Sequence, residues 1–138
     1  MAALRLPARL RDRILALAQA GYPEEVCGLL LGGQEAGVVA VRDLHETRNV
    51  HPDRTGDRFL IEPQDYLGAE RAAVERGLLV VGVWHSHPDH PACPSATDLE
   101  FAWPGWSYPI VSVNSGVATE LRSWRLDGEI FSEEEVLP

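Results

Sequence analysis

The 138-residue sequence contains only two cysteines, Cys27 and Cys93, and no long apolar run. Two cysteines cannot build the framework of several disulfides that stabilises many small secreted domains. The N-terminus, Met1 to Pro7, lacks the apolar core and the cleavage site of a signal peptide. No segment reaches the roughly 20 apolar residues that a membrane-spanning helix needs. We therefore expect a cytoplasmic protein that does not cross a membrane.

Basic residues are also few, because 12 Lys and Arg stand against 21 Asp and Glu, giving a formal net charge of −9. Binding to nucleic acid or to an anionic membrane depends on clustered basic side chains that contact phosphates. The composition therefore argues against both kinds of partner. The net negative charge would suit a partner with a basic surface, although in most proteins such a charge only improves solubility.

Internal repeats and low-complexity linkers are absent as well, and the length suits one compact domain, residues 1–138. Mixed helix and strand patterns predict an α/β domain with one central sheet. The acidic tail 132–138 is expected to be a frayed or solvated end, and the pair Gly32-Gly33 to end a strand. The expected helices are Pro7–Ala20, Pro63–Arg76 and Ser95–Trp103, and the expected strands are Val26–Leu31, Val38–Asn49, Arg58–Glu62, Leu78–Trp84, Tyr108–Asn114 and Thr119–Leu126, to which Ile130–Phe131 could add an edge.

The most informative stretch is His85-Ser-His87-Pro88, which follows the apolar, β-branched run 78–84. That run predicts a buried strand. Side chains alternate along a strand, so two histidines one residue apart point to the same side. Asp98, a short loop later, can complete a set of three ligands. Two histidines and one carboxylate are typical of a catalytic zinc site whose fourth position is left for water.

The spacing of this stretch, with Ser95 three residues before Asp98, resembles the signature of the JAMM metalloproteases, also called the MPN-plus family. That family carries an upstream glutamate in a Glu-x-Cys-Gly context, and this chain has Glu25-Val-Cys27-Gly28. Two matching parts in the expected order are far more specific than a lone His-x-His. The resemblance implies a curved mixed β-sheet flanked by helices, similar to the cytidine-deaminase-like architecture.

The resemblance also implies a role for each residue of the motif. One Zn²⁺ per chain would be held by His85, His87 and Asp98. Glu25 would be the general base that takes a proton from the attacking water. Ser95 would donate a hydrogen bond to the developing oxyanion, which is a catalytic role but not that of a nucleophile.

Simpler interpretations stand beside these roles. Glu24 is the adjacent alternative base, although it falls outside the Glu-x-Cys-Gly frame. Ser95 could be a plain helix N-cap and Asp98 a first-turn residue stabilised by the helix dipole, while the two histidines could be a hydrogen-bonded core pair. Cys27 is most simply a small buried residue. Cys93 is most simply an ordinary residue of the ligand loop, although a thiolate there could reach the metal.

In the family, the cleaved amide bond follows the C-terminal Gly-Gly tail of ubiquitin or of a ubiquitin-like protein. The compact chain resembles the stand-alone prokaryotic type, whose partners are β-grasp sulfur-carrier proteins. The expected function is therefore that of a zinc-dependent peptidase or isopeptidase. The alternatives are a peptidase of cell-wall or phage-tail peptides, a non-catalytic scaffold of the same fold, and a zinc deaminase. The deaminase is disfavoured because it needs His-x-Glu and Pro-Cys-x-x-Cys ligand motifs.

Overall fold

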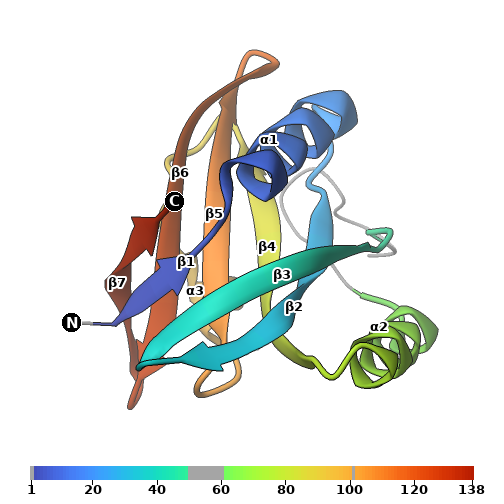
Figure 1. Cartoon of the computed structure of the whole chain (residues 1–138). Helices are drawn as coiled ribbons and strands as arrows, with labels where there is room; N and C mark the ends of the chain where they lie inside the picture. The colour runs from blue at the N-terminus through green and yellow to red at the C-terminus, as the bar shows by residue number, and fades with distance from the viewer. Residues whose placement is uncertain (1, 50–60, 101) are drawn as a thin grey trace.

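Seven β-strands form one strongly curved mixed sheet in the part of the chain that the structure, a computed structural model, describes: residues 2–49, 61–100 and 102–138 (Figure 1). The strands are β1 (Ala3–Arg5), β2 (Cys27–Glu35), β3 (Val38–Glu46), β4 (Leu79–Pro88), β5 (Ser107–Asn114), β6 (Val117–Asp127) and β7 (Ile130–Leu137). Their order is β1-β3-β2-β4-β5-β6-β7, and β1 closes the sheet by pairing with β7. The pairs β1–β3, β1–β7 and β4–β5 are parallel, and the others are antiparallel.

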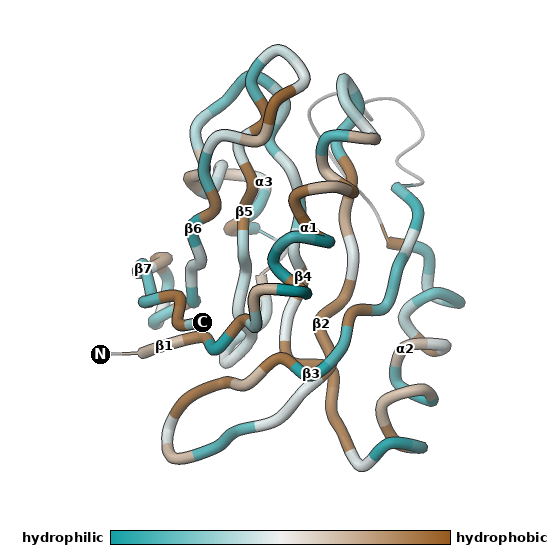
Figure 2. The backbone as a smooth tube through the Cα atoms, turned by 45° about the horizontal axis from the view of Figure 1, so that its top comes forward, coloured by the Kyte–Doolittle hydropathy of each residue, from teal (hydrophilic) through white to brown (hydrophobic). Residues whose placement is uncertain are grey.

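The two longer helices cover opposite faces of this sheet, and the strand β2 shows why. Its residues alternate between two hydrophobic clusters, with Leu30 in one and Leu29 and Leu31 in the other. Helix α1 (Ala8–Gly21) joins the Leu30 cluster, and α2 (Pro63–Glu75) joins the other through Ala69 and Ala73. Figure 2 shows the hydrophobic stretch of β2, the strand that contributes residues to both clusters. None of the helices among the described residues has the length and apolar composition that a membrane crossing requires.

The predicted architecture, a single α/β domain with a curved mixed sheet flanked by helices, is confirmed. Both long helices begin and end within one residue of the predicted bounds. The predicted strands Tyr108–Asn114 and Thr119–Leu126 form the antiparallel pair β5–β6, which turns at Ser115 and Gly116, whose φ angles of 50° and 86° suit a type I′ turn. Of the predicted strand 58–62, residues 58–60 lie outside the described part, and Ile61 forms an isolated bridge to Asn49.

The prediction that Gly32 and Gly33 end their strand is wrong, because β2 continues to Glu35. The register of β2 against β3 shifts between Leu31 and Gly32, which marks a bulge. A Cβ at Gly32 would lie 1.9 Å from the carbonyl oxygen of Ala40 on β3. The glycine therefore permits a close approach of two backbones inside the sheet instead of breaking the strand.

The prediction of a frayed acidic tail is also wrong, because this segment forms most of β7 and pairs with both β6 and β1. Strand alternation turns Glu134 inward, where it is only 2% exposed. Its carboxylate accepts hydrogen bonds from Ser123 Oγ (2.7 Å) and Arg125 Nη2 (2.8 Å) on β6. A buried charge with two such partners is part of the sheet and not a solvated end.

Two further differences concern short elements. The short β1 was not predicted, since three residues carry no periodic signal. The third helix, α3 (Ala96–Glu100), ends earlier than the predicted Trp103. It nevertheless follows Ser95 as expected, and it carries Asp98 to the site described below.

Candidate active site

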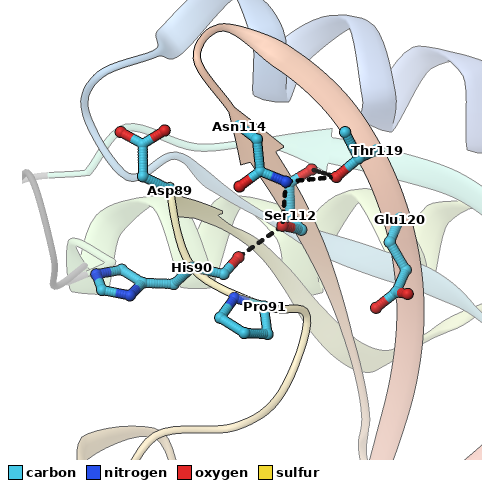
Figure 3. A pocket seen from close by; sticks show the side chains of 7 residues that line it. All are labelled: Asp89, His90, Pro91, Ser112, Asn114, Thr119 and Glu120. Carbon is cyan, nitrogen blue, oxygen red and sulfur yellow. Dashed lines mark hydrogen bonds between the residues drawn. The ribbon is translucent and has the colours of Figure 1, made fainter.

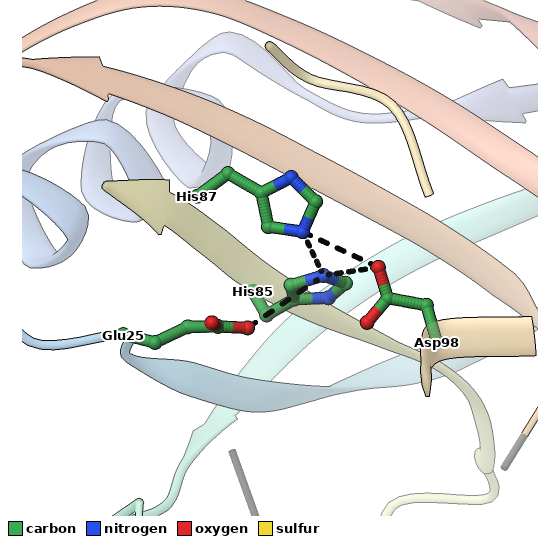
Figure 4. Close-up of side chains that lie close together, drawn as sticks. All are labelled: Glu25, His85, His87 and Asp98. Atoms are coloured by element: carbon green, nitrogen blue, oxygen red, sulfur yellow. Dashed lines mark hydrogen bonds and ion pairs between the residues drawn. The ribbon is translucent and has the colours of Figure 1, made fainter. Parts of the chain in front are cut away.

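Four side chains from distant parts of the sequence converge at one end of β4: Glu25, His85, His87 and Asp98 (Figure 4). One potential ligand atom from each lies within 4.8 Å of all the others. Glu25, His85 and His87 are buried, with exposed fractions of 3%, 1% and 8%. The structure therefore brings the three predicted metal ligands together and adds the glutamate from 60 residues upstream, while the role of each remains a prediction.

The spacing of the three predicted ligand atoms fits a tetrahedral metal ion. His85 Nε2 and His87 Nε2 lie 3.1 Å apart, and Asp98 Oδ2 lies 3.3 Å and 3.2 Å from them. Ligand atoms about 2.0 Å from a tetrahedral zinc ion lie about 3.3 Å from one another. Glu25 Oε1 lies farther out, 3.9 Å from His85 Nε2. This donor set can hold a zinc-like cation through three residues and leave a carboxylate beside its open position.

Burial and neighbouring charges set the protonation of these groups. Burial lowers the pKa of His85. Burial also acts to lower the pKa of His87, but the hydrogen bonds with Asp98 and the Pro91 carbonyl outweigh it and raise the pKa. Burial acts to raise the pKa of Asp98, yet the two histidines hold it well below its usual range. Asp98 is therefore an anion, as a ligand for a cation must be.

His87 is oriented by a second contact, because its Nδ1 lies 2.9 Å from the Pro91 carbonyl oxygen. A hydrogen bond from Nδ1–H to a carbonyl leaves the Nε2 lone pair free for a metal, the usual arrangement of metal-binding histidines. The loop that carries Pro91 is itself fixed to β5. Ser112 Oγ donates to the carbonyl of His90 (2.6 Å), as Figure 3 shows. His87 is thus held in place by β5 through this loop.

A cavity of about 430 Å³ opens beside the cluster and is lined by Glu25, His87, Cys93 and Ser95 among others. A second cavity of about 300 Å³ adjoins it (Figure 3), since His90 and Pro91 line both. The larger cavity gives a substrate access to the glutamate and to one histidine.

Ser95 and Asp98 cap α3 reciprocally. The Ser95 N–H donates to Asp98 Oδ2 (2.8 Å), and the Asp98 N–H donates to Ser95 Oγ (3.1 Å). The plain N-cap interpretation of Ser95 is therefore confirmed. Because Ser95 Oγ acts as an acceptor in this cap, its own hydroxyl hydrogen can still donate to a group in the cavity.

The backbone register explains the Glu-x-Cys-Gly motif. Cys27 lies opposite His85 and Gly28 opposite Trp84 in the antiparallel pair β2–β4, which places the preceding Glu25 beside the histidines. A Cβ at Gly28 would lie 2.4 Å from Trp84 Nε1, so only glycine fits there. Glycine at this position lets β2 lie against the bulky tryptophan next to the predicted metal ligands.

The simpler interpretations of neighbouring residues are now resolved in part. Glu24 is exposed, in contrast to buried Glu25. Cys27 is the buried residue that was predicted, and burial raises the pKa of its thiol to about 12. Cys93 is exposed at the cavity, with its Sγ 3.7 Å from Arg122 Nη1.

Two contacts at the site were not anticipated from the sequence. Ser86, between the two histidines, accepts a hydrogen bond from the Val26 N–H, and Asn49 donates one to the Glu25 carbonyl. No local pattern reveals either contact, because both join residues far apart in sequence.

Comparisons with known proteins agree with this geometry. The model of a family described as prokaryotic homologs of the JAB domain matches residues 7–127. The chain is 38% identical over 114 residues to a desampylase of Haloferax volcanii, covering 79% of this chain and 80% of the relative. It is 29% identical over 132 residues to a CysO-cysteine peptidase of Mycobacterium tuberculosis, covering 94% and 88%. A solved structure of a Desulfitobacterium hafniense protein matches with a TM-score of 0.83 at 29% identity, covering 99% and 92%.

Proposed function

Since the chain belongs to the family of prokaryotic JAB-domain homologues and is a metallopeptidase of the JAMM type, we propose that it hydrolyses the amide bond after the C-terminal Gly-Gly of a ubiquitin-like sulfur-carrier protein. The observation that carries the proposal is the convergence of Glu25, His85, His87 and Asp98 at an open cavity. The choice of substrate is supported by the desampylase and the CysO-cysteine peptidase, which resemble this chain over most of their lengths.

Each residue of the site has a task in this reaction. His85, His87 and Asp98 would hold a zinc ion, which when bound would supply Lewis acidity and lower the pKa of water. Glu25 accepts a proton from the attacking water and later delivers it to the leaving amine. Ser95 donates a hydrogen bond from its hydroxyl group to the substrate oxygen on which negative charge develops.

The shape of the substrate suits the position of the site. The site lies at the end of β4, beside a cavity that Glu25, His87 and Ser95 help to line. A Gly-Gly tail has no side chains and is extended, so it can lie along strand edges and bring its last carbonyl to the end of a strand. The globular body of the carrier then stays outside the cavity.

The test is to incubate the zinc-loaded protein with two forms of a sulfur-carrier protein and to follow their intact masses. One form carries an added residue in peptide linkage after Gly-Gly, and the other carries a lysine side chain in isopeptide linkage. We expect the mass of the extension to be lost, and Glu25→Gln and chelator-treated protein to be inactive controls. Cleavage of neither form would overturn the proposal, and cleavage of short cell-wall peptides instead would favour that alternative.

A further inference from the structure

The segment that carries Glu25 lies just before β2, where the regular pairing of β2 with β4 has stopped. The first pair of that ladder is Cys27 with His85, so Glu25 and Val26 precede it. A residue outside a ladder needs other contacts to hold its backbone. In this segment, two polar side chains provide them.

The first contact comes from Ser86 and replaces a missing ladder bond. In a hydrogen-bonded antiparallel pair, two residues exchange both of their N–H···O=C bonds. The Ser86 N–H donates to the Val26 carbonyl (2.9 Å), as expected of such a pair. The Val26 N–H, however, donates to the Ser86 side-chain Oγ (2.9 Å). Ser86 is only 1% exposed, so this hydroxyl belongs to the interior and not to the surface.

The second contact comes from the other side of the chain. Asn49, which follows β3, donates from Nδ2 to the Glu25 carbonyl at 2.8 Å. The Glu25 carbonyl and the Val26 N–H belong to one peptide group, which is therefore held by side chains from two different segments.

We propose that Ser86 and Asn49 are positioning residues that hold the Glu25 carboxylate at the distance from the metal site that proton transfer requires, an inference that rests on the general-base role of Glu25 in the proposed function. A general base must lie within hydrogen-bond reach of the water that it deprotonates. A misplacement of about 1 Å can cost about a hundredfold in rate. The Glu25 Oε1 lies 3.9 Å from His85 Nε2, so a small shift of its backbone changes this geometry directly.

The arrangement separates base positioning from metal binding. Alternation along β4 turns His85 and His87 to one side and Ser86 to the other. Replacing Ser86 by alanine removes the Oγ acceptor but keeps the backbone bond from its N–H to Val26. Zinc binding through the histidines and Asp98 is therefore retained while the base loses one anchor.

The experiment compares kcat, KM and zinc content of Ser86→Ala and Asn49→Ala with those of wild type on the extended carrier protein. We expect kcat to fall about tenfold in each, the factor typical of one lost buried hydrogen bond, with KM and zinc content within about twofold. Ser86→Thr keeps an acceptor oxygen and should restore most of kcat. The matched control is Ser123→Ala, which removes an equally buried hydroxyl on β6 that bonds Glu134 instead.

Several outcomes would overturn the inference. Wild-type kcat in folded Ser86→Ala and Asn49→Ala would do so, as would a loss of activity that only follows a loss of zinc. If Ser86→Ala does not fold, Asn49→Ala and Ser86→Thr still decide the matter. A tenfold fall of kcat in Ser123→Ala as well would show that the loss comes from disturbed packing in general and not from the position of Glu25.

A double-mutant cycle separates this inference from the proposed function on which it rests. If Ser86 acts through Glu25, Ser86→Ala should cause no further loss in a Glu25→Gln background. An additional tenfold loss there would show that Ser86 acts by another route. Full activity in Glu25→Gln alone would refute the role of Glu25 itself, whatever Ser86 does.

Discussion

Zinc binding at the proposed site should stabilise the folded protein, so removing the metal should lower its melting temperature. The three ligands come from the end of β4 and from α3, and their donor atoms lie 3.1–3.3 Å apart only when the sheet is formed. In the unfolded chain Asp98 and the histidines are not held together. Zinc therefore binds the native state preferentially, and its binding free energy adds to the free energy of unfolding.

The size of the effect follows from mass action. At free zinc a hundredfold above the dissociation constant, the stabilisation is about 2.7 kcal/mol. The entropy of unfolding is about 2.1 cal/mol/K per residue, which for 138 residues amounts to about 0.29 kcal/mol/K. Dividing the two gives a shift of about 9 °C between the zinc-loaded and the chelated protein.

The assay is differential scanning calorimetry with and without a chelator, on wild type and on the double variant His85→Ala with His87→Ala. Removing two buried imidazoles lowers stability by itself, so the quantity compared is the zinc-dependent shift within each protein. We expect about 9 °C for wild type, almost no shift for the double variant, and about one zinc per chain in wild type only. A double variant that keeps full zinc occupancy and the full shift would refute the ligand assignment.

Three further predictions concern single side chains. Glu25→Gln should keep fold and zinc but lose on the order of a hundredfold in turnover, whereas Glu24→Gln should be near wild type; the reverse result in a turnover assay would show that the wrong carboxylate was chosen. Ser95→Ala should lower kcat per zinc-loaded molecule far more than it changes KM, because the hydrogen bond from Ser95 strengthens as the oxyanion forms. A lower melting temperature with normal turnover would instead show that Ser95 acts only as a helix cap. Cys93→Ser should match wild type in rate under both reducing and oxidising conditions, and a higher rate than wild type under oxidising conditions would instead reveal an inhibitory thiol.

The parts of the fold that could be predicted from the sequence are those specified by short-range patterns. The apolar spacing of α1 is visible without the structure, and the structure buries Leu10, Ile14 and Ala18 of this helix. The same holds for the turn at Ser115-Gly116, which needs positive φ angles, and for Pro63 in the first turn of α2. In the helix the spacing of apolar residues reveals the buried face, and in the other two cases the local backbone restricts the residue type.

The errors arose where a tertiary contact decides the structure. A run of glutamates is typical of a solvated end, and only the partners Ser123 and Arg125 on β6 make Glu134 an interior residue. Gly32 is typical of a strand end, and only the neighbouring backbone at Ala40 requires it within the sheet. None of these partners is adjacent in sequence to the residue that it contacts, so no local pattern could have indicated the contacts.

The same distinction applies within the site. The convergence of the candidate ligands and the candidate base could be predicted because metal binding and proton transfer accept few residue types, and a strand places His85 and His87 on one side by its period alone. The proposed positioning residues obey no such restriction, since any hydrogen-bonding side chain of suitable reach could anchor a peptide group. Ser86 and Asn49 are therefore recognisable only through their distances to the Glu25 segment. A sequence search for the motif identifies residues that can do the chemistry, and the structure identifies the contacts that keep them in place.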